Sequence, residues 1–337
     1  MRRAVAPGRV NLIGDHTDYT GGLVLPMAID RFTEVRGTVG GLRVQLTSDD
    51  EQQPVDLPLQ VDRPQDANPL WAKYVAGVIA EMPSPAGFRG DVATTIPIGA
   101  GLSSSAALEV SIALALGFDG SALELAQLCQ RAENRATGLP SGIMDQLAIA
   151  AGVAGHALLI DCRELTVLPV AMPAEVEVVV QFITHRRLVG SPYADRVSEC
   201  ATAENVIGPL RQATIAQAKS IDDPVVRARA LHVIGENRRV GQFVAALEAG
   251  SIDDAGRLMA ASHESLRDLY QTSTPAMDAA VGVLLHTQGV YGARMTGGGF
   301  GGCVVALTEP GALTSGWVVR PVDGAFVCDD FDSDQED

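Results

Sequence analysis

The sequence of 337 residues is poor in lysine, and this shortage excludes two common ways of binding ATP. Only Lys73 and Lys219 occur among its 25 basic residues. Neither follows the glycines of a Walker A loop, and neither stands in a Val-Ala-Ile-Lys strand of the protein-kinase type. If the chain binds ATP, main-chain amides, hydroxyl groups and arginine must make the phosphate contacts that lysine makes in those two classes of protein.

Closely spaced cysteines and long apolar runs are also missing. The cysteines are far apart and include no Cys-x-x-Cys pair: Cys129, Cys162, Cys200, Cys303 and Cys328. This spacing excludes a disulfide framework and a cysteine zinc site. No apolar stretch approaches the roughly 20 residues that span a bilayer, and polar residues interrupt the N-terminus where a signal peptide would need an apolar run. These absences predict a cytoplasmic protein that does not bind membranes.

The chain carries too little positive charge to bind nucleic acid through its backbone phosphates. Its 41 acidic and 25 basic residues give a net charge of −16, and such binding needs a positive field. Residues 328–337 contain six of the acids and no base. This composition predicts an acidic, disordered tail.

Length and pattern predict two domains of mixed structure. At about 150 residues per domain, the chain is long enough for two, and we expect the boundary near residue 170, which gives residues 1–170 and 171–337. Expected strands and helices are segregated along the chain rather than strictly alternating. This order favours the α+β class over a doubly wound sheet.

The strongest local feature is a glycine- and serine-rich loop over residues 97–107. It follows a β-prone segment (91–97) and precedes an apolar helix, for which Ser103 or Ser104 is the expected N-cap. Glycines allow main-chain amides to approach an anion, and the helix N-terminus is directed at the same place. The segment therefore predicts a phosphate cradle without lysine, whereas the alternative is a serine-rich cap on a core helix.

A dense polar loop over residues 6–22 is the second feature. Asp15, His16, Thr17 and Asp18 stand together between glycines. Sugar hydroxyls need such hydrogen-bonding partners when they are buried, although a metal site or a solvated turn would use the same residue types. Arg9 lies among apolar neighbours in an expected strand, which a surface position does not explain.

Two further segments carry acids and glycines. Glu133 lies near the end of one expected helix, and Asp145 lies in the first turn of the next, after Gly142. A solvated helix charge and a favourable first-turn acid are the plain alternatives. Residues 297–302 match Gly-x-Gly-x-x-Gly, but an apolar strand follows at once, where a dinucleotide site would need a helix. We interpret this segment as a glycine loop packed against a ligand or another backbone.

Taken together, these segments resemble the galactokinase family of the sugar and metabolite kinase superfamily, over residues 4–325. The Pro-x-x-x-Gly-Leu-Ser-Ser-Ser loop is shared by the superfamily. Gly-Arg-Val-Asn-Leu-Ile-Gly followed by His-Thr-Asp-Tyr is specific to the galactokinase branch. The resemblance implies a ribosomal-protein-S5-like N-terminal domain and a ferredoxin-like α/β-sandwich C-terminal domain, with the active site in the cleft between them.

The resemblance also implies residue roles and a reaction. Asp145 matches the catalytic aspartate and Arg9 the arginine beside it, while Ser105 and Glu133 match the Mg²⁺ ligands. The implied sugar contacts are Asp15, His16, Thr17, Asp18, Gly142 and Tyr193. The implied ATP phosphate contacts are Gly99, Ala100, Gly101, Leu102, Ser103, Ser104 and Ser105. The implied reaction transfers the γ-phosphoryl group of ATP to the C1 hydroxyl of α-D-galactose, in an enzyme expected to be monomeric.

Two departures from the family pattern leave alternatives open. The family usually has glutamate at the position of Asp15, and the shorter side chain reaches less far toward a sugar. A related sugar-1-kinase acting on N-acetylgalactosamine or arabinose is therefore an alternative, as is a non-catalytic sensor that binds galactose and ATP. The family also has a longer segment where this chain has residues 308–316, a change expected to affect stability more than chemistry.

Overall fold

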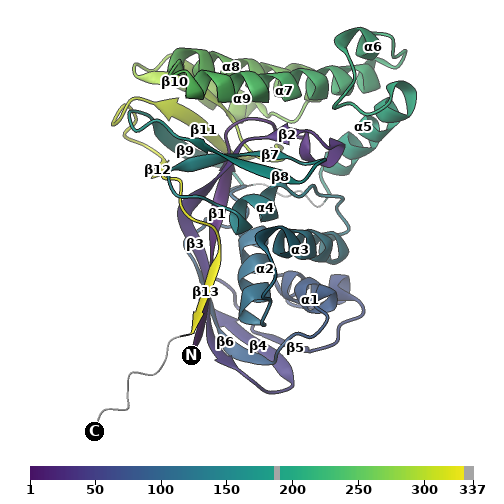
Figure 1. Ribbon diagram of the computed structural model, residues 1–337, viewed down its shortest axis with the longest axis vertical. Helices are drawn as coiled ribbons and strands as arrows, with labels where there is room; N and C mark the ends of the chain where they lie inside the picture. The colour runs from purple at the N-terminus through teal and green to yellow at the C-terminus, as the bar shows by residue number, and fades with distance from the viewer. Residues whose placement is uncertain (186–189, 330–337) are drawn as a thin grey trace.

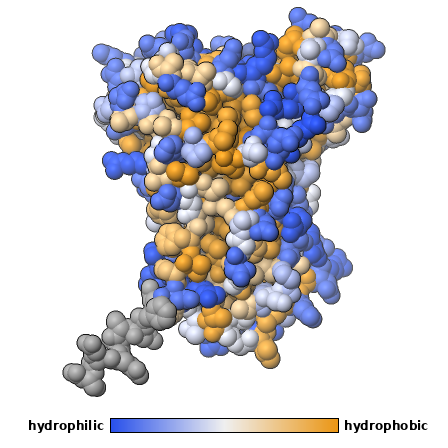
Figure 2. Space-filling model, in the orientation of Figure 1, coloured by the Kyte–Doolittle hydropathy of each residue, from blue (hydrophilic) through white to orange (hydrophobic). Residues whose placement is uncertain are grey.

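The computed structural model describes residues 1–185 and 190–329, which form two lobes joined at a narrow waist (Figure 1). Each lobe contains a β-sheet with helices packed on it. This arrangement confirms the predicted α+β class. The space-filling view shows hydrophobic residues gathered over the waist and hydrophilic residues around both ends (Figure 2).

The first lobe is built on a six-stranded sheet of order β13-β1-β3-β6-β4-β5. Its strands are β1 (Arg2–Asn11), β3 (Pro26–Val39), β4 (Arg43–Ser48), β5 (Val55–Pro58), β6 (Phe88–Thr94) and β13 (Phe326–Asp329). All neighbouring strands are antiparallel except β4 and β6. After its first two residues, β1 is buried along its whole length. It therefore carries Arg9 and Asn11 from the core of this lobe to the waist.

Helices of the first lobe pack on one side of this sheet (Figure 1). They are α1 (Ala72–Glu81), α2 (Ser104–Ala115), α3 (Ala122–Thr137) and α4 (Met144–Ala150), with the short helix η2 (Pro64–Asp66) before α1. Local signals set both ends of α3: Ser121 forms a capping box with Glu124, and Gly138 ends the helix with φ 73°. The helix α2 is rich in alanine and is buried on nearly all sides, so it lies at the centre of the group.

The second lobe has a four-stranded sheet of order β10-β11-β9-β12. Its strands are β9 (Glu177–Thr184), β10 (Val290–Met295), β11 (Gly302–Thr308) and β12 (Trp317–Val319). Its helices are α5 (Tyr193–Ile207), α6 (Ile215–Lys219), α7 (Pro224–Glu248), α8 (Ile252–Ser265), the π-helical turn η3 (Leu266–Tyr270) and α9 (Pro275–Leu285). The glycine loop of residues 297–302 connects two antiparallel strands, β10 and β11, and β11 is the strand that the sequence predicts after this loop.

A small three-stranded sheet of order β2-β7-β8 lies at the waist (Figure 1). It consists of β2 (Leu23–Val24), β7 (His156–Asp161) and β8 (Thr166–Ala171), and the short helix η1 (Asp18–Thr20) precedes β2. Within residues 1–185 and 190–329, no helix combines the length and the apolar character needed to cross a membrane.

The last described strand, β13, corrects one expectation. Cys328 and Asp329 were predicted to begin a disordered tail, but they end β13, which pairs with β1 so that Arg2 faces Asp329. An ion pair between these two side chains accompanies the pairing. Residues 330–337 of the predicted tail lie outside the described residues. Strand β13 follows the expected boundary near residue 170 in sequence, yet it lies in the sheet of the first lobe.

Candidate active site

Arg9 and Asp145 form a two-pronged ion pair at the waist. Arg9 Nε donates to Asp145 Oδ1 at 2.7 Å, and Nη2 donates to Oδ2 at 2.6 Å. The arginine side chain is 2% exposed, whereas that of Asp145 is 29% exposed. The hydroxyl of Ser103 also donates to Asp145 Oδ2, at 2.5 Å. One carboxylate is thus fixed in orientation by two rigid donors and still reaches the surface of the cleft.

The predicted phosphate loop lies against β1 next to this pair. The main-chain amide of Arg9 donates to the carbonyl of Leu102 at 3.2 Å, and Arg9 Nη1 donates to the carbonyl of Gly101 at 2.9 Å. Gly99 and Gly101 have φ values of 76° and 82°, in the region that favours glycine. Ser103 occupies the N-cap position of α2, as predicted, but its hydroxyl bonds to Asp145 rather than to the helix.

The two residues predicted to bind a metal ion lie together behind this loop. Ser105 Oγ is 3.1 Å from Glu133 Oε1. Burial raises the pKa of Glu133, and the nearby Asp145 raises it further. Glu133 belongs to α3, and Ser105 lies in the first turn of α2, so two helices meet at these oxygens. Among the described residues, no group of three His, Cys, Asp or Glu side chains forms a metal cluster.

The polar loop after β1 is held by bonds within the protein, and two of the predicted sugar contacts, Asp15 and Thr17, take part in them. Asp15 Oδ1 accepts from the Asn11 side chain at 2.9 Å and from the Gly297 amide at 3.1 Å, while Oδ2 is bonded by Arg294. Thr17 Oγ1 lies 2.8 Å from the carbonyl oxygen of Gly14 and is fully buried. The side chains of Asp15 and Thr17 therefore fasten the loop, and their predicted contact with a sugar stays a prediction.

His16 lies in a cluster of tyrosines under the same loop. Its Nδ1 is 2.9 Å from the hydroxyl of Tyr19, which is 2.6 Å from the hydroxyl of Tyr270. The ring of Tyr193, at the start of α5, lies 5.6 Å from the ring of His16. The structure thus brings the predicted residues His16 and Tyr193 together. Sequence reasoning missed Tyr270, because it comes from η3, 251 positions after Tyr19 of the loop.

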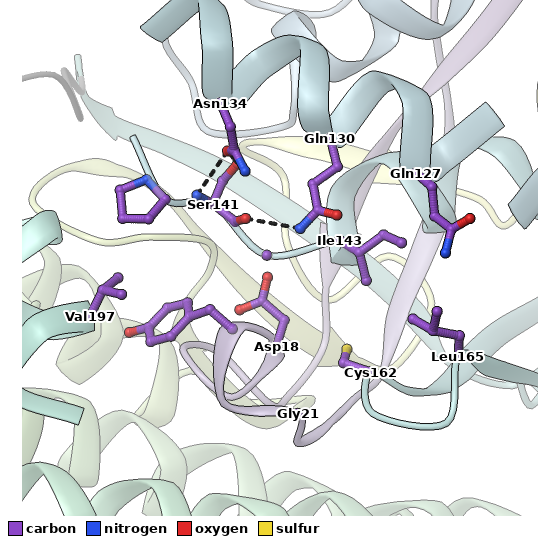
Figure 3. Close-up of a pocket in the computed structure, with 13 residues that line it drawn as sticks. Asp18, Gly21, Gln127, Gln130, Asn134, Ser141, Ile143, Cys162, Leu165 and Val197 are labelled. Atoms are coloured by element: carbon purple, nitrogen blue, oxygen red, sulfur yellow. Dashed lines mark hydrogen bonds between the residues drawn. The ribbon is translucent and has the colours of Figure 1, made fainter. Parts of the chain in front are cut away.

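Asp18 faces Gly142 across a short gap. Its carboxylate points toward the segment that carries Ser141 and Ile143 (Figure 3), and a Cβ atom at Gly142 would lie only 1.9 Å from Asp18 Oδ2. Only glycine allows this approach. Both residues line a cavity of about 430 Å³, together with other side chains: Tyr19, Gln127, Gln130, Asn134, Pro140, Cys162, Leu165 and Val197. The cavity borders the waist, so a polar ligand can reach Asp18.

The charge of Asp18 predicts a pH-dependent effect on stability. Burial raises the pKa of Asp18 from 3.8 to about 7, and the nearby Asp145 adds to this shift. Above pH 3.8 the unfolded chain loses this proton while the folded chain keeps it up to about pH 7, so stability falls as pH rises through this window. We expect Asp18→Asn to raise the melting temperature at pH 8 and to raise it much less at pH 5.

Calorimetric melting of both proteins at the two pH values measures this effect. Asp62→Asn, which makes the same change at an exposed position, serves as the control and should show no such difference. An Asp18→Asn stabilisation that is equal at pH 5 and pH 8 would contradict the shifted titration.

Side chains from the second lobe anchor the polar loop, and none of them was predicted. In α7, Glu236 Oε1 accepts from the Gly14 amide at 3.0 Å, His232 Nε2 is 3.2 Å from the Asp15 carbonyl, and Asn237 Oδ1 accepts from the Leu23 amide at 2.7 Å. Two arginines and His232 outweigh burial and lower the pKa of Glu236 to about 2. The sequence shows these residues only as polar positions in a long helix, so no local signal identifies them.

Comparison with known proteins explains this constellation. Three family models match the chain: "Galactokinase galactose-binding signature" at residues 2–37, "GHMP kinases N terminal domain" at 71–153 and "GHMP kinases C terminal" at 243–314. A galactokinase of Homo sapiens is 42% identical over 327 residues, which cover 91% of this chain and 83% of the human protein. The chain belongs to the galactokinase family. A relative from Roseiflexus, also named galactokinase, is 44% identical over 90% of this chain and 82% of its own length.

Solved structures agree with this family assignment. The crystal structure of Lactococcus lactis galactokinase complexed with galactose has a TM-score of 0.89, with 30% identity over 96% of this chain and 94% of that one. A mevalonate kinase structure, 21% identical, has a TM-score of 0.67 and supports the fold alone. The predicted two-lobed kinase fold is therefore confirmed, and as a galactokinase-family member the chain is an ATP-dependent sugar kinase.

Proposed function

We propose that the chain transfers the γ-phosphoryl group of ATP to the C1 hydroxyl of α-D-galactose, giving galactose 1-phosphate and ADP. One observation carries this proposal: the Arg9–Asp145 pair, at 2.6 and 2.7 Å, lies where the glycine- and serine-rich loop meets β1. Phosphoryl transfer depends mainly on positioning and on neutralising charge. The fixed carboxylate can orient the hydroxyl group that accepts the phosphoryl group. The fixed guanidinium beside it can balance the negative charge of that phosphoryl group.

In this proposal Asp145 accepts or orients the proton of the C1 hydroxyl, and Arg9 faces the transferring phosphoryl group. Arg9 is almost wholly buried, so its charge acts in a medium of low dielectric and is little screened by water. Its remaining bond to the Gly101 carbonyl holds it to the phosphate loop. The Arg9 side chain thus contacts both Asp145, which would face the sugar hydroxyl, and the loop that would hold the ATP phosphates.

The sugar would lie between Asp18 and the segment around Gly142, with His16 and Tyr193 on its other side. The proximity of Asp18 to Gly142 and the cavity that both line support this placement. Asp15 and Thr17 would act on the sugar only through the shape of the loop, since their side chains are bonded within the protein.

The ATP phosphates would lie along residues 99–105, at the N-terminus of α2. The positive end of this helix and the main-chain amides of the loop favour an anion there. Ser105 and Glu133 fit a Mg²⁺ ion, because the pair offers only oxygen atoms, as hard cations prefer. When bound, the ion would offset phosphate charge.

ADP release, followed with a coupled assay, tests the proposal. We expect turnover with galactose and Mg²⁺, and none when Mg²⁺ is removed by a chelator. The panel adds 2-deoxygalactose, N-acetylgalactosamine and arabinose. Faster turnover with N-acetylgalactosamine or arabinose than with galactose would identify that sugar as the substrate. Binding of galactose and ATP without any ADP release would identify a sensor.

We further propose that the enzyme acts as a monomer in the cytoplasm. The boundary between its two domains would lie near residue 170. Within residues 1–185 and 190–329 the cysteines form no disulfide, which suits a reducing compartment. Most of the second sheet and its helices follow residue 170, whereas β13 returns to the first lobe. Light scattering coupled to size-exclusion chromatography tests the oligomeric state.

A further inference from the structure

A buried side-chain amide connects the proposed metal ligand to a second acid. Gln146 follows Asp145 in α4 and is fully buried. Its Nε2 atom donates to Glu133 Oε2 at 2.8 Å and lies 3.4 Å from Glu109 Oε2. An amide nitrogen carries two hydrogens, so it can serve both acceptors. Three helices, α2, α3 and α4, therefore meet at this one nitrogen.

The two carboxylate oxygens of Glu133 have different hydrogen-bond partners. Oε2 accepts from Gln146, and the Ser141 hydroxyl, whose one hydrogen is directed mainly at Asn134 Oδ1 at 2.7 Å, lies 3.2 Å away. Oε1 is left facing Ser105 Oγ at 3.1 Å. A glutamate on a helix has three flexible torsions, and bonds to one oxygen restrict where the other can point. The structure thus holds Oε1 toward the serine through contacts made on the far side of the carboxylate.

Packing alone does not account for a glutamine at this position. The neighbouring Leu147 and Ala148 are buried and apolar, and a buried amide costs free energy unless its bonds are made. Gln146 Oε1 and Glu109 Oε1 are both buried and have no hydrogen-bond partner among the described residues. An apolar side chain of similar size would avoid that cost. Orientation of Glu133 is a benefit that an apolar side chain would not provide.

Glu109 is the other anchor of the amide. It is fully buried in α2, and burial raises the pKa of its carboxyl group well above the ordinary value, with a further increase from Glu133. Gln146 Nε2 thus lies between an oxygen of Glu109 and an oxygen of Glu133, and this geometry holds the amide from the α2 side.

We propose that Gln146 is a positioning residue that orients Glu133 for a divalent cation, with Glu109 as its anchor. This inference rests on the proposed function, since it takes Glu133 as a ligand of that ion. Groups that orient a metal ligand typically change metal affinity by about 10- to 100-fold when they are removed. When Gln146 is replaced, Glu133 keeps its contact with Ser105 and the longer one with Ser141, so we expect a change near the lower end.

The test measures binding of Mn²⁺ by electron paramagnetic resonance in the presence of ADP, together with the Mg²⁺ dependence of turnover. Gln146→Met, which removes the amide at similar volume, should weaken Mn²⁺ binding about tenfold. The Mg²⁺ concentration for half-maximal ADP release should rise by a similar factor, while KM for galactose stays within about twofold. Glu109→Gln, which keeps an oxygen for the amide, should bind Mn²⁺ about as well as the original chain.

Controls separate this role from a general loss of structure. Gln45→Met makes the same change in β4, which lies at the end of the first lobe away from the waist (Figure 1), and should leave Mn²⁺ binding unchanged. If Gln146→Met does not fold, Gln146→Asn, which withdraws the amide by one methylene, replaces it with the same expectation. Unchanged Mn²⁺ affinity, or an equal loss of galactose affinity, would overturn the proposal. An original chain that turns over galactose but binds no Mn²⁺ would overturn this inference and the proposed ion, and the sugar kinase assignment would stand.

Discussion

Asp145→Asn is expected to lower kcat by about 10²- to 10⁴-fold, the range typical of a lost acid–base group. The amide keeps the shape of the side chain but cannot take up the proton of the sugar hydroxyl. It also removes the charge that two Arg9 nitrogens and the Ser103 hydroxyl surround. Galactose affinity, measured by calorimetry, should change little, because Asp18 and Gly142 are intact.

Steady-state ADP release and galactose binding, measured on the same preparation, test this expectation. Asp56→Asn serves as the control, since it removes an exposed acid that pairs with Arg43 in the first lobe. Near-normal kcat in Asp145→Asn would remove this carboxylate from the reaction. A parallel loss of galactose binding would instead make it a sugar contact.

Arg294→Met is expected to destabilise the protein by about 3–5 kcal/mol, the usual result of removing one partner of a buried ion pair. Arg294 is fully buried, and its partner Asp15 is 2% exposed. Burial raises the pKa of Asp15, and Arg294 opposes that shift. Without the guanidinium, the carboxyl group must take a proton or remain an uncompensated charge. The bond from Arg294 to the Leu12 carbonyl, at 3.0 Å, is lost as well.

Urea unfolding of both proteins measures the free energy of unfolding. Arg267→Met is the matched control, because Arg267 pairs with Asp268 at exposed positions, where such a pair contributes at most about 1 kcal/mol. Combining Arg294→Met with Asp15→Asn should recover part of the loss, since the buried charge is then absent as well. Equal free energies of unfolding for Arg294→Met and Arg267→Met would contradict the expected contribution of the Arg294–Asp15 pair to stability.

Local signals in the sequence predict much of the fold. Ser121 and Gly138 bound α3 because a capping box and a left-handed glycine act within one turn of the chain. The glycine loop of residues 297–302 is distinguished from a dinucleotide site by the strand that follows it. Arg9 and Asp145 are 136 positions apart, so their pairing was expected from the family resemblance and not from any local pattern.

Partners that meet only in three dimensions could not be predicted. The sequence shows Asp15 as one acid in a polar loop, and its resemblance to a sugar contact gave no sign of Arg294 almost 280 residues later. The same holds for Gln146, which has ordinary polar character until Glu109 and Glu133 are placed beside it. Charged and amide groups gain their role from burial and from their partners, and neither is encoded locally.

The pairing of β13 with β1 has a consequence for protein synthesis. Val5 at the start of the chain is opposite Phe326 near the described end, and these strands form one edge of the sheet. At typical translation speeds, the ribosome needs on the order of tens of seconds to make the residues between them. During that interval the nascent first lobe has an open strand edge that can pair with other chains. Completion of the sheet therefore depends on residues that are made more than 300 positions after their partners in β1.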